Sequence, residues 1–133
     1  MGARLEYAKV VDREIFLIRG GKVHPGLDNQ VLLSEESGKT AAFLIMRAWA
    51  DDHGTFTEQW RIESPGGTVI YESVPRELHM ASKAHVEKLQ DEVADLPIEY
   101  PADNYVVVFT LDENEVARVT FPIVTPEPQR ERA

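Results

Sequence analysis

The chain has 133 residues, 43% of them hydrophobic, and a formal net charge of −9. This length suits a single domain, and the apolar fraction is sufficient for a packed core. Negative charge repels phosphate groups, so the sequence predicts no nucleic-acid partner and no anionic membrane partner. The chain contains no cysteine, which excludes disulfides and thiolate chemistry and fits a reducing compartment.

Hydrophobic runs are too short for a membrane helix, which needs about 20 consecutive apolar residues. The first residues, MGARLEYAKVVDREIF, carry charges throughout and lack the apolar core of a secretory signal. We therefore expect a cytoplasmic protein.

The N-terminal region has two β-branched or aromatic runs, Leu5–Val11 and Glu14–Ile18, separated by Asp12 and Arg13. This pattern predicts a β-hairpin. The segment 22–30 is rich in turn-forming residues and has no hydrophobic period, so it is expected to be a loop.

The middle of the chain predicts an antiparallel meander. In Phe56–Ser64, the residues Phe56, Trp60 and Ile62 share one parity while polar residues occupy the other, as in a half-buried strand. A Pro-Gly-Gly turn and the β-rich run TVIYESV follow. The preceding segment, Ala41–Ala50, also contains helix-forming residues. Its position before this hairpin favours a strand.

In Ser82–Val93 the apolar residues Val86, Leu89 and Val93 recur at spacings of three and four. This spacing predicts a short amphipathic helix, with Ser82 as its N-cap. Pro97 would prevent the helix from continuing.

A second hairpin is predicted from Asn104–Leu111 and Val116–Val124, which flank the polar turn DENE. Pro122 has no N–H to donate, so it is expected at a sheet edge or at a bulge. Residues 125–133 contain proline and charge but no hydrophobic residue larger than alanine, so we expect a disordered tail after one domain spanning 1–124.

The sequence G-K-T at Gly38–Thr40 raises the possibility of a phosphate-binding loop, with Lys39 and Thr40 on the phosphates and Asp112 on magnesium. However, Leu33 stands where such a loop has its first glycine, and the intervening glutamates would repel phosphate. The fold would also have to be a parallel sheet with crossover helices. A turn that leads into the next strand is the preferred interpretation.

No other pattern predicts chemistry. The four histidines, at positions 24, 53, 79 and 85, lack the i, i+4 spacing of two metal ligands on one helix face. The acidic turns DDHG and DENE do not have the spacing of a calcium loop. We therefore predict no catalytic residue, no metal site and no cofactor.

The run PADNYVVVF resembles the immunoglobulin-like pattern in which a tyrosine precedes the penultimate strand and its hydroxyl group binds back to the backbone. Tyr105 matches that tyrosine. Val107 stands where an immunoglobulin has its second cysteine, so the disulfide-bonded version is excluded. Trp49 and Trp60 both match the core tryptophan, and the alternating pattern favours Trp60.

Residues 4–124 also resemble a family of small, uncharacterised bacterial sandwich proteins. The resemblance rests on LEYAKVV, on REIFLIRGG, on IESPGGTVIY and on the tyrosine that precedes a strand and an acidic turn. It implies an all-β fold, namely an antiparallel two-sheet immunoglobulin-like sandwich, here with one short helix. It implies no catalytic residue.

These observations together predict a non-catalytic protein-binding or assembly module, with a protein or a second copy of the chain as its partner. The N-terminal hairpin would offer an unpaired sheet edge. The candidate contact residues are Leu5, Tyr7, Lys9, Arg47 and Trp49. The alternatives are a phosphate-loop hydrolase that uses Lys39, Thr40 and Asp112, and a carbohydrate-binding sandwich in which Trp49 and Tyr71 stack on sugar rings.

Overall fold

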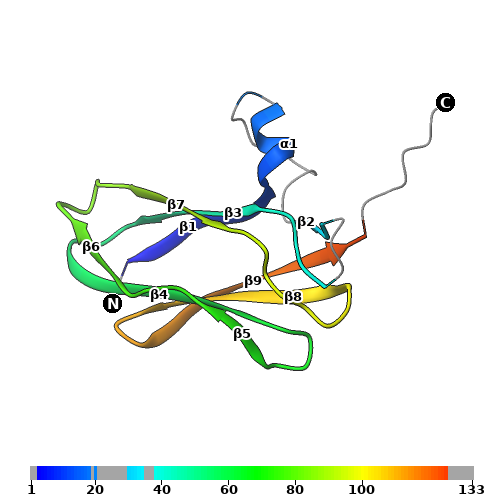
Figure 1. Ribbon diagram of the computed structural model, residues 1–133. Coiled ribbons are helices and arrows are strands. Elements are labelled where there is room, and N and C mark those ends of the chain that lie inside the picture. The colour runs from blue at the N-terminus through cyan, green and yellow to red at the C-terminus, as the bar shows by residue number, and fades with distance from the viewer. Residues whose placement is uncertain (1–2, 19, 21–29, 35–37, 126–133) are drawn as a thin grey trace.

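The computed structural model describes residues 3–18, 20, 30–34 and 38–125, and Figure 1 shows their arrangement. Within these residues the chain forms strands and one short helix, in the following order: β1 (Arg4–Asp12), α1 (Arg13–Ile18), β2 (Val31–Leu32), β3 (Phe43–Ala50), β4 (Gly54–Glu63), β5 (Val69–Glu72), β6 (Arg76–Met80), β7 (Glu87–Val93), β8 (Ala102–Leu111) and β9 (Asn114–Val124).

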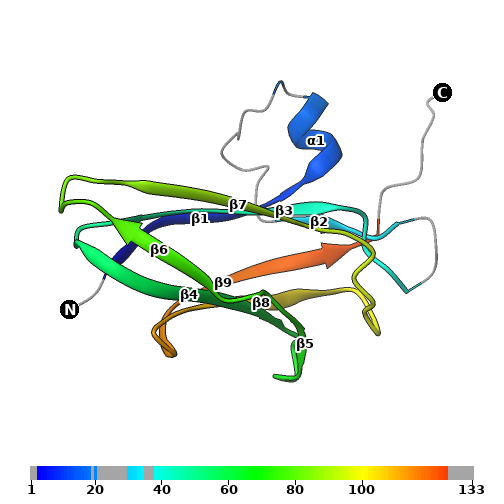
Figure 2. The same ribbon diagram turned by 60° about the vertical axis from the view of Figure 1, so that its left-hand side comes forward.

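The strands form two sheets that face each other, as the turned view in Figure 2 shows. The three-stranded sheet has the order β1-β3-β7. The larger sheet has the order β2-β9-β8-β4-β5, and β6 pairs with β4 beyond the end of β5. All pairs are antiparallel except the short pair between β2 and β9. The prediction of an all-β fold with two sheets and one short helix is confirmed.

The core lies between the sheets because alternate residues of each strand point inward. Its largest apolar side chains come from the central strands of both sheets: Phe43, Ile45, Trp49, Trp60, Ile62, Tyr105, Phe109 and Phe121. The predicted strand at 41–50 and the hairpin of β8 and β9 are therefore confirmed. The predicted meander is wrong in one pairing, because β3 pairs with β1 and β7 in the three-stranded sheet, while β4 and β5 form their hairpin in the larger sheet. Trp49 is as deeply buried as Trp60, so both are core tryptophans.

The predicted N-terminal hairpin is wrong, because its second run forms helix α1 instead of a strand. Asp12 acts as the N-cap, since its carboxylate accepts the backbone N–H of Ile15 at 3.1 Å. At the other end Gly20 has a φ of 72° and donates its N–H to the carbonyl of Leu17. Asp12 and Gly20 were therefore the residues in the sequence that indicated a helix, although the β-branched residues between them favoured a strand.

The predicted helix at Ser82–Val93 is also wrong. Its second half is strand β7, which pairs with β3 along its whole length. Val86 is 41% exposed, while Leu89 and Val93 point inward from alternate positions. Ser82 begins a turn instead of a helix, because its carbonyl accepts the N–H of His85. Without β7, the inner strand β3 would lack a hydrogen-bonding partner on that side.

Pro122 occupies an irregular position, as predicted. The pairing of β8 with β9 shifts register between Tyr105–Phe121 and Ala102–Ile123, and Pro122 lies within that shift. Its missing N–H therefore interrupts no regular ladder bond. The predicted loop at 22–30, apart from Gln30, and the predicted tail, apart from Thr125, lie outside the described residues.

Candidate functional site

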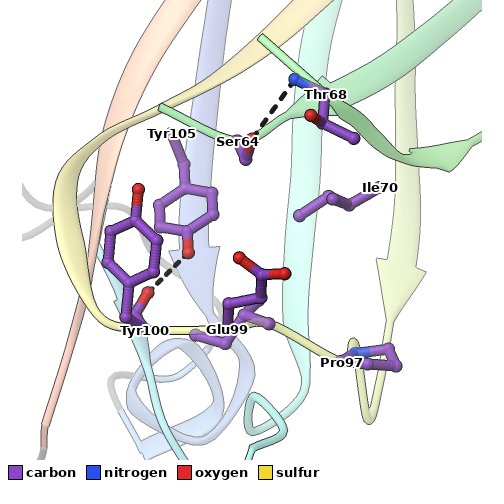
Figure 3. A pocket seen from close by; sticks show the side chains of 8 residues that line it. Ser64, Thr68, Ile70, Pro97, Glu99, Tyr100 and Tyr105 are labelled. Carbon is purple, nitrogen blue, oxygen red and sulfur yellow. Dashed lines mark hydrogen bonds between the residues drawn. The ribbon is translucent and has the colours of Figure 1, made fainter. Parts of the chain in front are cut away.

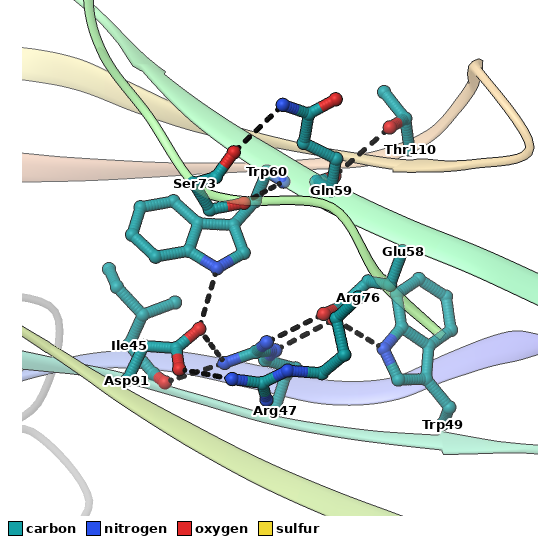
Figure 4. A network of polar contacts seen from close by, with 10 residues as sticks. All are labelled: Ile45, Arg47, Trp49, Glu58, Gln59, Trp60, Ser73, Arg76, Asp91 and Thr110. Carbon is teal, nitrogen blue, oxygen red and sulfur yellow. Dashed lines mark hydrogen bonds and ion pairs between the residues drawn. The ribbon is translucent and has the colours of Figure 1, made fainter. Parts of the chain in front are cut away.

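The densest group of polar side chains lies between the two sheets, where charges are unusual (Figure 4). Arg47 of β3 is 0% exposed, and Glu58 of β4 is 1% exposed. The guanidinium of Arg47 donates to both carboxylate oxygens of Glu58, at 2.8 Å and 2.6 Å. The indole of Trp49 donates to the same carboxylate at 2.7 Å. The pair thus joins the three-stranded sheet to the larger sheet.

A second carboxylate completes this buried network. Asp91 of β7 lies 3.0 Å from Nη1 of Arg47 and accepts hydrogen bonds from the indole of Trp60 at 2.9 Å and from Arg76 at 2.8 Å. Burial alone would raise the pKa of Asp91. The hydrogen bond from Trp60 and the positive charges of Arg47 and Arg76 outweigh that effect and lower the pKa.

The network pairs two cations with two anions, and its donors are well satisfied. Arg47 also donates to the carbonyl of Ile45 at 3.2 Å. A general acid or base needs access to a reacting atom, and here the carboxylates of buried Glu58 and partly buried Asp91 are occupied by protein donors. The arrangement therefore holds the sheets together. Sequence reasoning missed Glu58, although it shares the inward parity of Phe56 and Trp60.

A cavity of about 240 Å³ opens at one end of the sandwich (Figure 3). The β4–β5 turn contributes Ser64 and Thr68 to its wall, β5 contributes Ile70, and residues 97–100 and Tyr105 complete it. It is smaller than the ~300–1,000 Å³ typical of pockets that bury drug-sized ligands. Its lining is mainly apolar, with exposed Tyr100 beside it.

Tyr105 forms the inner wall of this cavity and closes a turn. Its hydroxyl group donates to the carbonyl of Tyr100 at 2.5 Å, five residues upstream, as the tyrosine pattern predicted. Burial raises the pKa of Tyr105, and the nearby Tyr100 and Glu99 add to the effect. A phenol with a raised pKa, already bonded to a carbonyl, is a structural hydrogen-bond donor and a poor base.

The five predicted contact residues do not form one surface. Arg47 and Trp49 have no exposed surface and belong to the buried network, so they cannot contact a partner in this conformation. Leu5 points toward the core and packs against it. Tyr7 and Lys9 lie on the opposite side of the three-stranded sheet, and Tyr7 is 36% exposed.

The carbohydrate-binding alternative fails for the same reason. Trp49 is fully buried, and Tyr71 stacks on Trp60 with ring centroids 5.3 Å apart. The two predicted platforms therefore face protein groups.

The phosphate-loop alternative is also wrong. Thr40 is buried and exchanges hydrogen bonds with Leu96, so its hydroxyl group is occupied. Lys39 pairs with Pro97 in an isolated bridge. Asp112 lies in the tight turn that follows the ten-residue strand β8, where it accepts the N–H of Thr57. The required parallel sheet with crossover helices is replaced by an antiparallel sandwich.

The described histidines bind protein groups separately. His79 contacts Thr55 at 3.0 Å, and His85 lies 2.7 Å from Glu87. Within residues 3–18, 20, 30–34 and 38–125, no cluster of three or more potential metal ligands occurs. In the same residues, no helix is long and apolar enough to cross a membrane.

Comparison with known proteins gives a structural match only. The chain matches no protein family and no curated protein sequence. Its fold is similar to part of the alkylpurine DNA glycosylase AlkC of Pseudomonas fluorescens, solved bound to DNA that contains an abasic-site analogue. The TM-score is 0.58 and the identity 11% over 91% of this chain. The match spans 30% of the glycosylase chain.

This match corrects two predictions. The fold was expected to serve a non-catalytic protein-binding or assembly module, and it occurs instead within a DNA glycosylase. Nucleic acid was excluded in favour of a protein or homo-oligomeric partner, and the similar structure is bound to DNA. A net charge of −9 describes the whole chain, whereas binding depends on the charge of one surface, so the net charge alone does not exclude a nucleic-acid partner.

Proposed function

We propose that this chain is a DNA-contacting β-sandwich domain. The observation that supports this proposal is the likeness of nearly the whole chain to a domain-sized part of a DNA-bound repair enzyme. Because the match covers less than a third of that enzyme, the similar fold is no reason to assign base excision to this chain. That the chain is not itself an enzyme stays a prediction.

We further infer that the sandwich is immunoglobulin-like. The strand order supports this assignment, because β1-β3-β7 faces β9-β8-β4 and a short strand, β2, runs parallel to β9 at the edge. The hydrogen bond from Tyr105 to Tyr100 is a second supporting feature. Location in the cytoplasm, where DNA is accessible in bacteria, is part of this proposal, as is membership of the small bacterial sandwich family.

The proposal is tested by fluorescence anisotropy with two labelled duplexes of the same sequence, one intact and one with an abasic-site analogue. We expect binding at low ionic strength that weakens as salt is added, since phosphate contacts release counterions. An unlabelled duplex should compete. Failure to bind either duplex in low salt would overturn the proposal.

A further inference from the structure

The cavity at the end of the sandwich has walls that the chain's own hydrogen bonds hold in place (Figure 3). The β4–β5 turn forms one wall, where Ser64 donates its N–H to the carbonyl of Thr68 and its hydroxyl group accepts the N–H of Thr68. Residues 97–100 form the facing wall, and the bond from the hydroxyl group of Tyr105 to the carbonyl of Tyr100 fixes its end. The cavity is therefore preformed, as most small-molecule sites are.

Glu99 is the residue that gives this apolar cavity a charge. The other seven lining residues carry hydroxyl groups or apolar side chains. Figure 3 shows the carboxylate of Glu99 directed into the space between Tyr105 and Ile70. Within the described residues, no hydrogen bond or ion pair joins this carboxylate to another side chain. Its oxygens are therefore available to the donors of a ligand.

The charge of Glu99 acts on the inner wall of the cavity. Burial is the main reason why the pKa of Tyr105 is raised, and the negative charges of Tyr100 and Glu99 add to that effect. The lining contains no lysine, arginine or histidine that would balance the carboxylate. The cavity therefore favours cations and repels anions, in keeping with the net charge of −9.

Tyr100 adds an aromatic ring at the opening of the cavity. It is 48% exposed, and Figure 3 shows its ring standing beside that of Tyr105. Aromatic faces attract cations, and they also pack well against flat apolar groups. A ligand that matches this cavity therefore combines a positive group with an apolar body smaller than a drug-sized molecule.

We propose that this cavity binds a small organic amine in its protonated form. The ammonium group pairs with the carboxylate of Glu99, and the apolar body packs against Tyr105 and Ile70. The inference goes beyond the proposed DNA contact and does not rest on it. A phosphate-bearing ligand is disfavoured here, because its charge has the same sign as that of Glu99.

The test is a titration of the ¹⁵N-labelled protein, followed by amide chemical shifts at neutral pH and low ionic strength. The probes are phenethylamine and phenethyl alcohol, which share one aromatic body and differ in the charged group. We expect the amine to bind with a Kd on the order of 1 mM and to shift the amides of residues 64, 68 and 98–100. The alcohol should bind about five-fold more weakly, since it lacks the ion pair.

Two pairs of variants separate the site from general charge. Glu99→Gln should abolish the preference for the amine, whereas Glu77→Gln removes the same charge from an exposed position outside the cavity lining and should preserve it. Tyr100→Ala keeps the backbone carbonyl that accepts the Tyr105 hydroxyl group, and it should weaken amine binding about three-fold. Tyr100→Phe keeps the ring and should bind as the wild type does.

The absence of shifts in the lining amides at about 10 mM amine, where the expected Kd gives about 90% occupancy, would overturn the proposal. Equal affinities for the amine and the alcohol would overturn the ion pair with Glu99. Equal effects of Glu99→Gln and Glu77→Gln would do the same, because net charge would then explain the preference. Circular dichroism of each variant verifies the fold. Duplex binding is measured separately, so its failure would overturn the DNA proposal and leave this one intact.

Discussion

At the scale of single residues, the contact between Arg47 and Glu58 is the feature that most needs a physical explanation. Removing both charges from water costs several kcal/mol each, and only close pairing with further hydrogen bonds offsets that cost. Here the carboxylate accepts two bonds from Arg47 and one from Trp49. Removing Glu58 would leave Trp49 without this acceptor and Arg47 with only Asp91 as a paired carboxylate.

We expect Glu58→Gln to lower the free energy of unfolding by on the order of 3 kcal/mol, because the buried guanidinium of Arg47 then keeps only the partly exposed Asp91 as a counter-charge. Urea unfolding measures the change. Glu77→Gln on neighbouring β6 is the control, since Glu77 is exposed and the shape change is the same. Equal stability of the two variants would contradict the role assigned to Glu58.

Asp91 predicts a pH dependence of stability. Its pKa is lower in the folded chain than in the unfolded chain, where it is near 3.8. The folded state therefore binds this proton less readily, so the stabilisation is present above the unfolded pKa and is lost as pH falls through the folded pKa. Urea titrations between neutral pH and pH 3 should show stability falling at the acid end. Asp91→Asn should flatten that part of the profile, and an unchanged profile would contradict the assignment.

At the scale of elements, two segments adopt the opposite secondary structure to the one that their sequence patterns predict. Arg13–Ile18 is β-branched and aromatic, but Asp12 and Gly20 cap it, and no strand of the described residues pairs with it. Glu87–Val93 has a helical spacing, but it completes the ladder of β3. Local capping made the first segment a helix. The second segment is a strand because β3 needs a hydrogen-bonding partner on that side.

The cap of α1 can be tested directly. Asp12→Ala should destabilise the protein by about 1 kcal/mol, because the N–H of Ile15 loses its acceptor. Asp12→Asn retains a side-chain oxygen and should cost much less. Hydrogen exchange of the α1 amides, together with urea unfolding, measures both. Equal losses in the two variants would show that the charge of Asp12, and not capping, stabilises this segment.

At the scale of the whole molecule, the network of Arg47, Glu58, Asp91 and Arg76 links the two sheets across a core that is mainly apolar. Arg47 and Asp91 come from the three-stranded sheet, and Glu58 and Arg76 come from the larger one.

We therefore expect the two sheets to unfold together. Trp49 reports on the three-stranded sheet and Trp60 on the larger one, so Trp60→Phe and Trp49→Phe variants each leave one fluorescent probe. Within each variant, the fluorescence transition in urea should coincide with that seen by far-ultraviolet circular dichroism. Transitions at different urea concentrations would show that the sheets unfold separately.

The sequence by itself determined the all-β class, the hairpin of β4 and β5 and the last hairpin, because strict alternation and turn residues act over a few neighbouring positions. It did not determine that β3 leaves this hairpin and joins the other sheet. It also identified Tyr105 and the irregular position of Pro122. Only the tertiary structure decided the fate of 82–93, the burial of Arg47 and Trp49, and the pairing of Glu58 with residues 11 and 9 positions away on the facing sheet. The physical reason is that strand pairing and charge pairing depend on which segments meet in space, and local periodicity carries no information about that meeting.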